Sequence, residues 1–201
     1  MHILHTVKFS KSANAMRDLP PDSGAEVAFA GRSNAGKSSA LNALAAHKGL
    51  ARVSKTPGRT QLINIFSLDD ARRLVDLPGY GYAKVPVGVR DHWRELVDTY
   101  LKQRKALKGV VLIIDSRHPL KEFDRQMLAY AEAIDLPCHV VLTKSDKLSR
   151  SEAARTLALV RAELGADGSA DARVSVQLFS ATAKVGLDEA RDVVMRWLGS
   201  A

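Results

Sequence analysis

The chain has 201 residues, 46% hydrophobic and 26% charged, which is the composition of a folded globular domain with a sizeable buried core. Lys and Arg total 30 against 22 Asp and Glu, and this formal charge of +8 suits a polyanion such as RNA, although an inert basic surface would carry the same charge. The single cysteine, Cys138, excludes an internal disulfide framework and fits a reducing cytoplasm, and no signal peptide or membrane span of roughly 20 apolar residues is visible.

Short apolar runs alternate with helical patterns, which predicts an α/β fold with a mostly parallel sheet flanked by helices. Strands are expected at residues 26–30, 61–68, 72–76, 109–115, 139–143 and 173–179, and helices at 37–46, 89–101, 124–134, 151–164 and 187–198. The strand at 61–68 is expected to be an antiparallel edge strand, because a short turn at Asp69 and Asp70 separates it from the next one. Flexible stretches are expected at 48–60 and 77–88.

A phosphate-binding loop is predicted between the first strand and the first helix. Its residues are Gly31, Arg32, Ser33, Asn34, Ala35, Gly36, Lys37 and Ser38. The glycines allow the backbone to wrap a phosphate, and the helix N-terminus adds partial positive charge. Lys37 would supply a full charge to the outer phosphates, and the Ser38 hydroxyl would bind Mg²⁺.

A second phosphate motif is formed by Asp76, Leu77, Pro78 and Gly79 at the end of a predicted strand. Asp76 is placed to hold Mg²⁺ through water, and the Gly79 N–H to meet the γ-phosphate. Thr60 lies between the two motifs and is the natural second hydroxyl ligand for Mg²⁺. Alone, Asp-x-Pro-Gly is a common turn and a lone Thr means little, but their positions after the phosphate loop favour a nucleotide site.

The predicted base is guanine, because Thr143, Lys144, Ser145 and Asp146 follow the strand at 139–143. A carboxylate at Asp146 can accept hydrogen bonds from N1–H and N2–H₂ of guanine, whereas adenine would leave it unpaired. The Lys144 stem can lie against the base. Backbone N–H groups of Ser180 and Ala181, after the last strand, are placed for the guanine O6. Taken alone, Asp146 could equally be a helix cap.

The wording of these motifs resembles the EngB (YihA/YsxC) family of bacterial ribosome-biogenesis GTPases, in the TrmE-Era-EngA-like class of small G proteins. The resemblance rests on Gly-Arg-Ser-Asn-Ala-Gly-Lys-Ser-Ser, Thr-Pro-Gly-Arg-Thr-Gln and Asp-Leu-Pro-Gly-Tyr-Gly-Tyr-Ala, and covers most of the chain. It implies a Ras-like fold with six strands, an N-terminal extension over 1–24 and a single G domain over 25–201. It also implies cytoplasmic, Mg²⁺-dependent GTP hydrolysis, large ribosomal subunit assembly and normal cell division and septation.

The family's ligand positions carry over onto the motifs above and extend them. The resemblance adds a switch loop of Gly58, Arg59, Thr60, Gln61 and Leu62, and places Phe179 with Ser180 and Ala181 at the base. Thr143 stands where many G proteins have Asn. We expect a monomer that binds GTP and GDP, contacts the large subunit or its rRNA and does not bind a membrane.

The catalytic set is expected to comprise Lys37, Thr60, Gly79 and Asn34. Tyr80 stands where related enzymes use a Gln to orient the attacking water, so intrinsic hydrolysis should be slow. Asn34 either helps to hold K⁺ near the phosphates, as in relatives with this loop, or only stabilises the loop. The slow turnover leaves open a GTP-regulated RNA- or ribosome-binding module with negligible hydrolysis. An ATP-using P-loop protein is disfavoured by Asp146.

Two basic clusters are candidates for RNA contact. One comprises Arg52, Lys55 and Arg59 on the first switch loop, and the other Lys102, Arg104, Lys105 and Lys108 after the second switch helix. If they share a face, the GTP state could gate RNA binding, although solvated charge runs are more common. Tyr80, Tyr82, His92 and Trp93 gather near the second switch, where the tyrosines are candidates for exposed, functional residues and Trp93 for the core.

Overall fold

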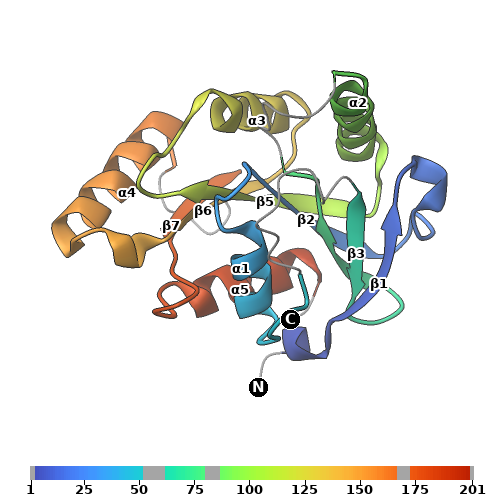
Figure 1. The fold of residues 1–201 in the computed structure, drawn as a ribbon, viewed down its shortest axis with the longest axis horizontal. Helices are drawn as coiled ribbons and strands as arrows, with labels where there is room; N and C mark the ends of the chain where they lie inside the picture. The colour runs from blue at the N-terminus through green and yellow to red at the C-terminus, as the bar shows by residue number, and fades with distance from the viewer. Residues whose placement is uncertain (1–2, 52–61, 80–86, 167–172, 200–201) are drawn as a thin grey trace.

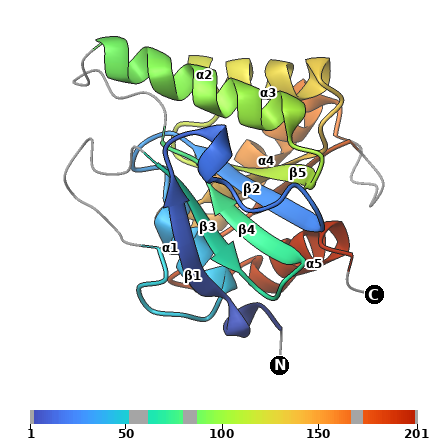
Figure 2. The ribbon, with the colours of Figure 1, turned by 90° about the vertical axis from the view of Figure 1, so that its right-hand side faces the viewer.

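A seven-stranded sheet lies between two layers of helices (Figure 1). The computed structural model describes residues 3–51, 62–79, 87–166 and 173–199, with residues 87–91 and 93 described by their backbone only. The strand order is β1-β3-β4-β2-β5-β6-β7. Helices α2, α3 and α4 cover one face of the sheet, and α1 and α5 cover the other (Figures 1 and 2). The predicted α/β fold class is confirmed.

The helices and strands follow the expected chain order. The strands are β1 (Lys8–Ala13), β2 (Ala25–Gly31), β3 (Ile63–Ser67), β4 (Arg72–Asp76), β5 (Leu107–Asp115), β6 (Cys138–Thr143) and β7 (Val174–Leu178). The α-helices are α1 (Lys37–Leu44), α2 (Val87–Gln103), α3 (Glu122–Ala133), α4 (Arg150–Leu164) and α5 (Leu187–Trp197). Short 3-10 turns are η1 (Ile3–Thr6), η2 (Met16–Asp18) and η3 (Ser145–Lys147). The apolar periodicity therefore predicted each of these strands and α-helices except β1.

The expected count of six strands was wrong, because the N-terminal segment supplies β1. This strand pairs antiparallel with β3, so β3 is the second strand from the edge rather than the edge itself. The Phe9 ring packs edge-on against Phe66 with centroids 5.9 Å apart, and Ser12 Oγ donates to Asn64 Oδ1 at 2.6 Å. Five of the six β1 residues are exposed, so the strand has almost no hydrophobic alternation for sequence reasoning to detect.

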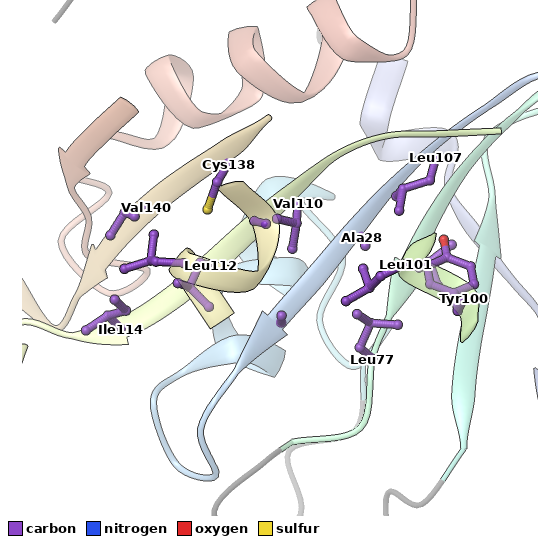
Figure 3. Close-up of a cluster of buried hydrophobic side chains, with 14 of the residues drawn as sticks. Ala28, Leu77, Tyr100, Leu101, Leu107, Val110, Leu112, Ile114, Cys138 and Val140 are labelled. Carbon is purple, nitrogen blue, oxygen red and sulfur yellow. The ribbon is translucent and has the colours of Figure 1, made fainter. Parts of the chain in front are cut away.

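Each face of the sheet has its own hydrophobic core. The core beneath α2, α3 and α4 includes Tyr100, Leu112 and Cys138, which Figure 3 shows within one cluster of buried side chains. The opposite core joins Phe29 and Phe66 of the sheet to Leu41 of α1 and Val194 of α5. Burial raises the pKa of the Cys138 thiol to about 12, so this cysteine is an inert core residue as expected.

Strands β2, β4, β5, β6 and β7 run parallel, so their carboxyl ends meet at one edge of the sheet. The segment after β2 enters α1, the one after β6 enters η3, and the one after β7 leads to α5. In open parallel sheets, ligands bind outside the carboxyl ends of the strands. The three predicted motifs follow β2, β4 and β6, and are thereby brought to this edge.

The amino ends of the same strands carry a buried charge cluster around Glu26. Its carboxylate accepts hydrogen bonds from Arg73 at 3.1 Å, from Arg104 at 2.6 and 3.0 Å and from the Tyr100 hydroxyl at 3.0 Å. Arg104 also donates to the main-chain oxygens of Pro20 and Pro21. The expectation that Arg104 contacts RNA was therefore wrong, because its guanidinium is buried and fixes the N-terminal segment to the domain.

Within the described ranges, no helix is both long and apolar enough to span a lipid bilayer. The expected flexible stretch at 48–60 lies largely outside the described residues, as does most of 77–88. Residues 87 and 88, expected within the second stretch, instead belong to α2, which begins at Val87.

Candidate functional site

The loop between β2 and α1 has the backbone of a phosphate cradle. Gly31 ends β2 beside β5, and a Cβ at this position would stand 2.6 Å from the Ile113 oxygen. Gly36 has φ +102° and Asn34 φ +62°, so the chain makes two left-handed turns before α1 begins at Lys37. The Ala35 N–H donates to the Arg32 oxygen at 3.1 Å. The N-terminus of α1 therefore opens directly onto this loop.

The other loop side chains differ in exposure. Asn34 is exposed, whereas Ser33 and Ser38 are half-buried, with Ser38 in the first turn of α1. Arg32 Nε lies 3.5 Å from Asp124 Oδ2, at the start of α3. The Asp124 carboxylate also accepts from the Lys121 N–H at 3.0 Å. Arg32 thus packs its side chain against α3, while its main chain shapes the loop.

Lys37 and Asp76 form a buried ion pair within the site. Asp76 is the last residue of β4 and is 3% exposed, and its Oδ1 accepts from the Lys37 Nζ, whose residue is 9% exposed. The Leu77 N–H donates to the Phe29 oxygen at 3.0 Å, so the chain leaves β4 alongside β2. Pro78 is buried and Gly79, half-buried, ends this described range. The phosphate loop and the Asp76 motif are therefore in direct contact.

Thr143, at the end of β6, joins the predicted base motif to the phosphate loop. Its hydroxyl Oγ1 donates to the main-chain oxygen of Ala35, and lies 3.1 Å from the Ile114 oxygen. A Cβ added at Gly36 would stand 3.3 Å from the same Oγ1. The Thr that stands where many G proteins have Asn therefore still hydrogen-bonds the loop through its side chain.

Lys144 spans the distance between the two motifs. It has φ +58°, and its Nζ donates to the Asn34 oxygen at 2.7 Å and to Asp115 Oδ2 at 2.8 Å. Asp115 ends β5 and also accepts from Arg117 at 2.7 and 2.9 Å. Although burial opposes ionisation, the hydrogen bonds from Arg117 and Lys144 hold the pKa of Asp115 well below its usual range. A carboxylate anion therefore fixes the Lys144 ammonium.

Asp146 is held by the segment after β7. The Ser180 hydroxyl donates to Asp146 Oδ1 at 2.6 Å and this bond lowers the pKa of Asp146, so the carboxylate is ionised at neutral pH. The Ser145 N–H donates to the Phe179 oxygen at 3.1 Å. The Ser180 N–H donates to the Val185 oxygen at 3.0 Å, which leaves the Ala181 N–H as the better placed donor of the expected pair.

The structure brings most of the sequence-predicted residues to this edge. Gly58, Arg59, Thr60 and Gln61 lie outside the described residues, as do Tyr80 and Tyr82, and Leu62 is half-buried just before β3. The Trp93 side chain is likewise outside the description, and His92 Nε2 lies 3.1 Å from the Asn14 oxygen.

Asp115 and Arg117 were missed by sequence reasoning. The only available signal was a charged residue directly after the apolar run of β5. That position lies at the carboxyl end of a parallel strand, where ligand-facing residues gather.

The amino-acid sequence was compared with protein-family models and with known proteins, and both comparisons found GTP-binding proteins. The family model described as "50S ribosome-binding GTPase" matches residues 26–144. The chain is 56% identical over 198 residues to the probable GTP-binding protein EngB of Stenotrophomonas maltophilia, covering 98% of both chains. It is 55% identical over 193 residues to the protein of the same name from Coxiella burnetii, covering 96% of this chain and 93% of the relative.

Solved structures show the same fold. A crystal structure of a probable GTP-binding protein EngB superposes with a TM-score of 0.69 at 19% identity, covering 87% of this chain and 99% of the other. A point variant of Aquifex aeolicus Era bound to GDP·AlF4⁻ gives a TM-score of 0.67 at 19% identity, covering 89% of this chain and 58% of the other. With near-full-length identity above 50% to named relatives, the chain belongs to the EngB family of GTP-binding proteins.

Proposed function

We propose that this protein binds GTP and GDP at the carboxyl edge of the sheet and works as a GTPase switch in large ribosomal subunit assembly. The observation that carries the proposal is the contact between the motifs, with Lys144 Nζ 2.7 Å from the Asn34 oxygen and the Lys37 ammonium on Asp76. This contact supports a single guanine-nucleotide site made of the phosphate loop and the predicted base motif.

The phosphates would occupy the loop from Gly31 to Ser38, in front of the α1 N-terminus. Lys37 would exchange its Asp76 partner for the outer phosphates. At the other end, Asp146 would accept N1–H and N2–H₂ of guanine, the Lys144 stem would lie along the base, and the Ala181 N–H would meet O6. Adenine offers an acceptor at N1 and no N2 amine, so it would leave the Asp146 carboxylate unpaired.

The residues present fit a magnesium ion. Asp76 is a buried carboxylate in contact with the first residue of α1, and the hydroxyl-bearing Ser38 follows in the same turn. Hydroxyl and carboxylate oxygens are the donors that Mg²⁺ prefers. Ser38 and Thr60 would bind it directly and Asp76 through water. Such an ion neutralises charge between the β- and γ-phosphates.

Hydrolysis is proposed to be slow without a partner. Tyr80 cannot orient water as a Gln does, so Lys37, Thr60 and the Gly79 N–H would act by positioning and charge stabilisation. The same Tyr80 favours the second candidate, a GTP-regulated ribosome-binding module with negligible hydrolysis. Single-turnover hydrolysis with and without large subunits separates the two candidates. The rate of GTP hydrolysis should rise with the subunit if the protein is a GTPase, and should stay unchanged if it is only a binding module.

Potassium is a further candidate at the phosphate loop. Asn34 is exposed at the turn of the loop, so its side chain is accessible to a cation beside the phosphates. A monovalent cation there would replace an arginine finger. Faster turnover in KCl than in NaCl at equal ionic strength supports this role, and equal rates rule it out.

The ribosomal partner is supported by the excess of basic residues and by the family description. Lys105 and Lys108 are exposed, but they lie at the amino ends of β2 and β5, far along the strands from the phosphate loop. We therefore assign nucleotide-gated contact to the other basic cluster, Arg52, Lys55 and Arg59. The action is proposed to be cytoplasmic and linked to cell division and septation, and the domain to be one G domain over 25–201.

Co-sedimentation with large ribosomal subunits tests this assignment. Binding should require a non-hydrolysable GTP analogue and should be absent with GDP. Charge reversal of Arg52 and Lys55 should weaken binding and flatten its salt dependence, because fewer phosphate contacts release fewer counterions. The matched reversal of Lys105 and Lys108 should leave binding unchanged. Equal binding to large subunits with the GTP analogue and with GDP would contradict the proposed switch.

A further inference from the structure

A buried chain of hydrogen bonds runs behind the segment that carries Ser180 and Ala181. Gln177, on β7, is 1% exposed and its Nε2 donates to the Gly186 oxygen at 2.6 Å. Its Oε1 lies 2.7 Å from His139 Nε2, on the neighbouring strand β6. His139 Nδ1 in turn lies 2.7 Å from Ser175 Oγ. The Gln177 side chain thus joins β6 and β7 to Gly186, the residue that precedes α5.

The hydrogen-bond roles along this chain can be assigned. Burial lowers the pKa of His139 to about 4, so the imidazole is neutral at pH 7 and carries one N–H. Because the Gln177 amide nitrogen donates to carbonyl oxygens, its Oε1 is the acceptor, and His139 Nε2 must donate to it. His139 Nδ1 then accepts from the Ser175 hydroxyl. Each group has a single role, so the Gln177 amide has one orientation.

Gly186 is the point at which this chain reaches the loop. It has φ +64°, and a Cβ there would stand 2.1 Å from the Leu178 oxygen and 2.5 Å from Gln177 Nε2. Its neighbour Val185 accepts from the Ser180 N–H at 3.0 Å, and these two residues form an isolated antiparallel bridge. The Ser180 hydroxyl accepts from the Ala183 N–H at 3.0 Å and donates to Asp146. The loop is closed on itself and fixed at its base by Gln177.

We infer that Gln177 is a positioning residue for guanine: it holds the 180–185 loop so that the Ala181 N–H faces O6 while Ser180 orients Asp146. The inference rests on the proposed GTP site. Gln177 itself does not contact the nucleotide in this proposal and acts through the 180–185 loop. We expect the larger effect at the base, because Gln177 hydrogen-bonds the residue that precedes α5, next to the 180–185 loop, whereas the phosphate loop lies between β2 and α1.

Replacement of Gln177 tests the inference through base selectivity. Gln177→Met keeps the length and loses the hydrogen bonds to His139, Gly186 and Leu178. Gln177→Glu keeps an acceptor for His139 but cannot donate to the Gly186 or Leu178 oxygens. Titration of each with GDP and with ADP at fixed Mg²⁺ should show GDP affinity lowered about 3- to 10-fold, the effect of a misplaced hydrogen bond, with ADP affinity unchanged. The matched control Ser175→Ala, which removes only the far end of the chain, should keep the wild-type GDP affinity.

A second measurement needs no variant. Hydrogen exchange on the wild-type protein should show the Ser180 and Ala183 amides protected before any nucleotide is added, because the loop is already closed. Unchanged GDP:ADP selectivity in a folded Gln177 variant, or amides that become protected only with GDP, would overturn the positioning role. A wild-type protein that binds no GDP would instead refute the proposed function, so the two failures are distinguishable.

Discussion

The Lys144 ammonium lies 2.7 Å from the main-chain oxygen of Asn34, although 110 residues separate them in sequence. This contact joins the motif predicted for the base to the loop predicted for the phosphates. Asp115 Oδ2 accepts a second hydrogen bond from the same ammonium at 2.8 Å. The predicted base motif and the predicted phosphate loop are thereby in direct contact through the Lys144 side chain.

Removal of the Asp115 charge should loosen this link. In Asp115→Asn the amide keeps the shape but loses the charge that pairs with Lys144 and Arg117, so we expect GDP to bind at least about 10-fold more weakly, the lower value for one hydrogen bond to a charged group. Stopped-flow dissociation of a fluorescent GDP analogue measures the change as a faster off-rate. The control Asp135→Asn removes a surface carboxylate paired with Arg173, both more than 60% exposed, and should have no effect.

Asp76 should matter for the magnesium-dependent part of binding. In Asp76→Asn we expect the gain in GTP affinity on adding Mg²⁺ to shrink at least tenfold, because the water-mediated carboxylate ligand is lost, while GDP affinity in EDTA changes little. Calorimetric titration with and without Mg²⁺ measures both. Asp69→Asn, in the exposed turn before β4, is the matched control. An unaltered magnesium effect in Asp76→Asn would exclude Asp76 from the metal site.

Glu26 should matter for stability and not for nucleotide selectivity. Glu26→Gln removes the buried carboxylate that the Arg73 and Arg104 guanidinium groups share, and loss of one partner of a buried pair costs about 3–5 kcal/mol. Urea unfolding should show this loss, with the GDP:ADP affinity ratio unchanged in the folded variant. Asp188→Asn removes a carboxylate whose side chain is 86% exposed from its pair with Arg191, and should cost less than about 1 kcal/mol. Equal losses in the two variants would contradict the assignment.

His139 should make folding less favourable in acid. Burial lowers its folded-state pKa to about 4 from 6.5, so the unfolded chain binds the extra proton first as the pH falls. The contribution of neutral His139 to the free energy of unfolding is fully present above pH 6.5 and is lost as the pH falls from 6.5 to 4. For a pKa shift of this size the loss is at most roughly 3 kcal/mol. Urea unfolding at pH 7, 5.5 and 4.5 should therefore show a flatter dependence in His139→Gln. The same pH dependence of the unfolding free energy in the wild type and in His139→Gln would contradict this role of His139.

The sequence predicted the strands and motifs that a local pattern of residues reveals. Apolar periodicity located the strands that end at Gly31, Asp76 and Thr143, and the parallel arrangement then placed their motifs together. It missed β1, whose exposed residues carry no alternation, and it misplaced Arg104, whose burial depends on Glu26, 78 residues away. Gln177 and Asp115 were missed for the same reason. Their roles depend on partners distant in sequence, Lys144 for Asp115 and His139 for Gln177, which no short window of sequence contains.

Nucleotide titration of the wild-type protein and of Asp146→Asn tests the central claim, guanine binding through Asp146, most directly. The wild type should bind GTP and should bind ATP and XTP far more weakly. In Asp146→Asn, GTP affinity should decrease by about 100-fold or more with the loss of two hydrogen bonds to a carboxylate. XTP should bind this variant better than the wild type, because the amide can donate to the xanthine C2 oxygen. Equal affinity of the wild type for GTP and ATP, or an unchanged GTP affinity in Asp146→Asn, would contradict the account.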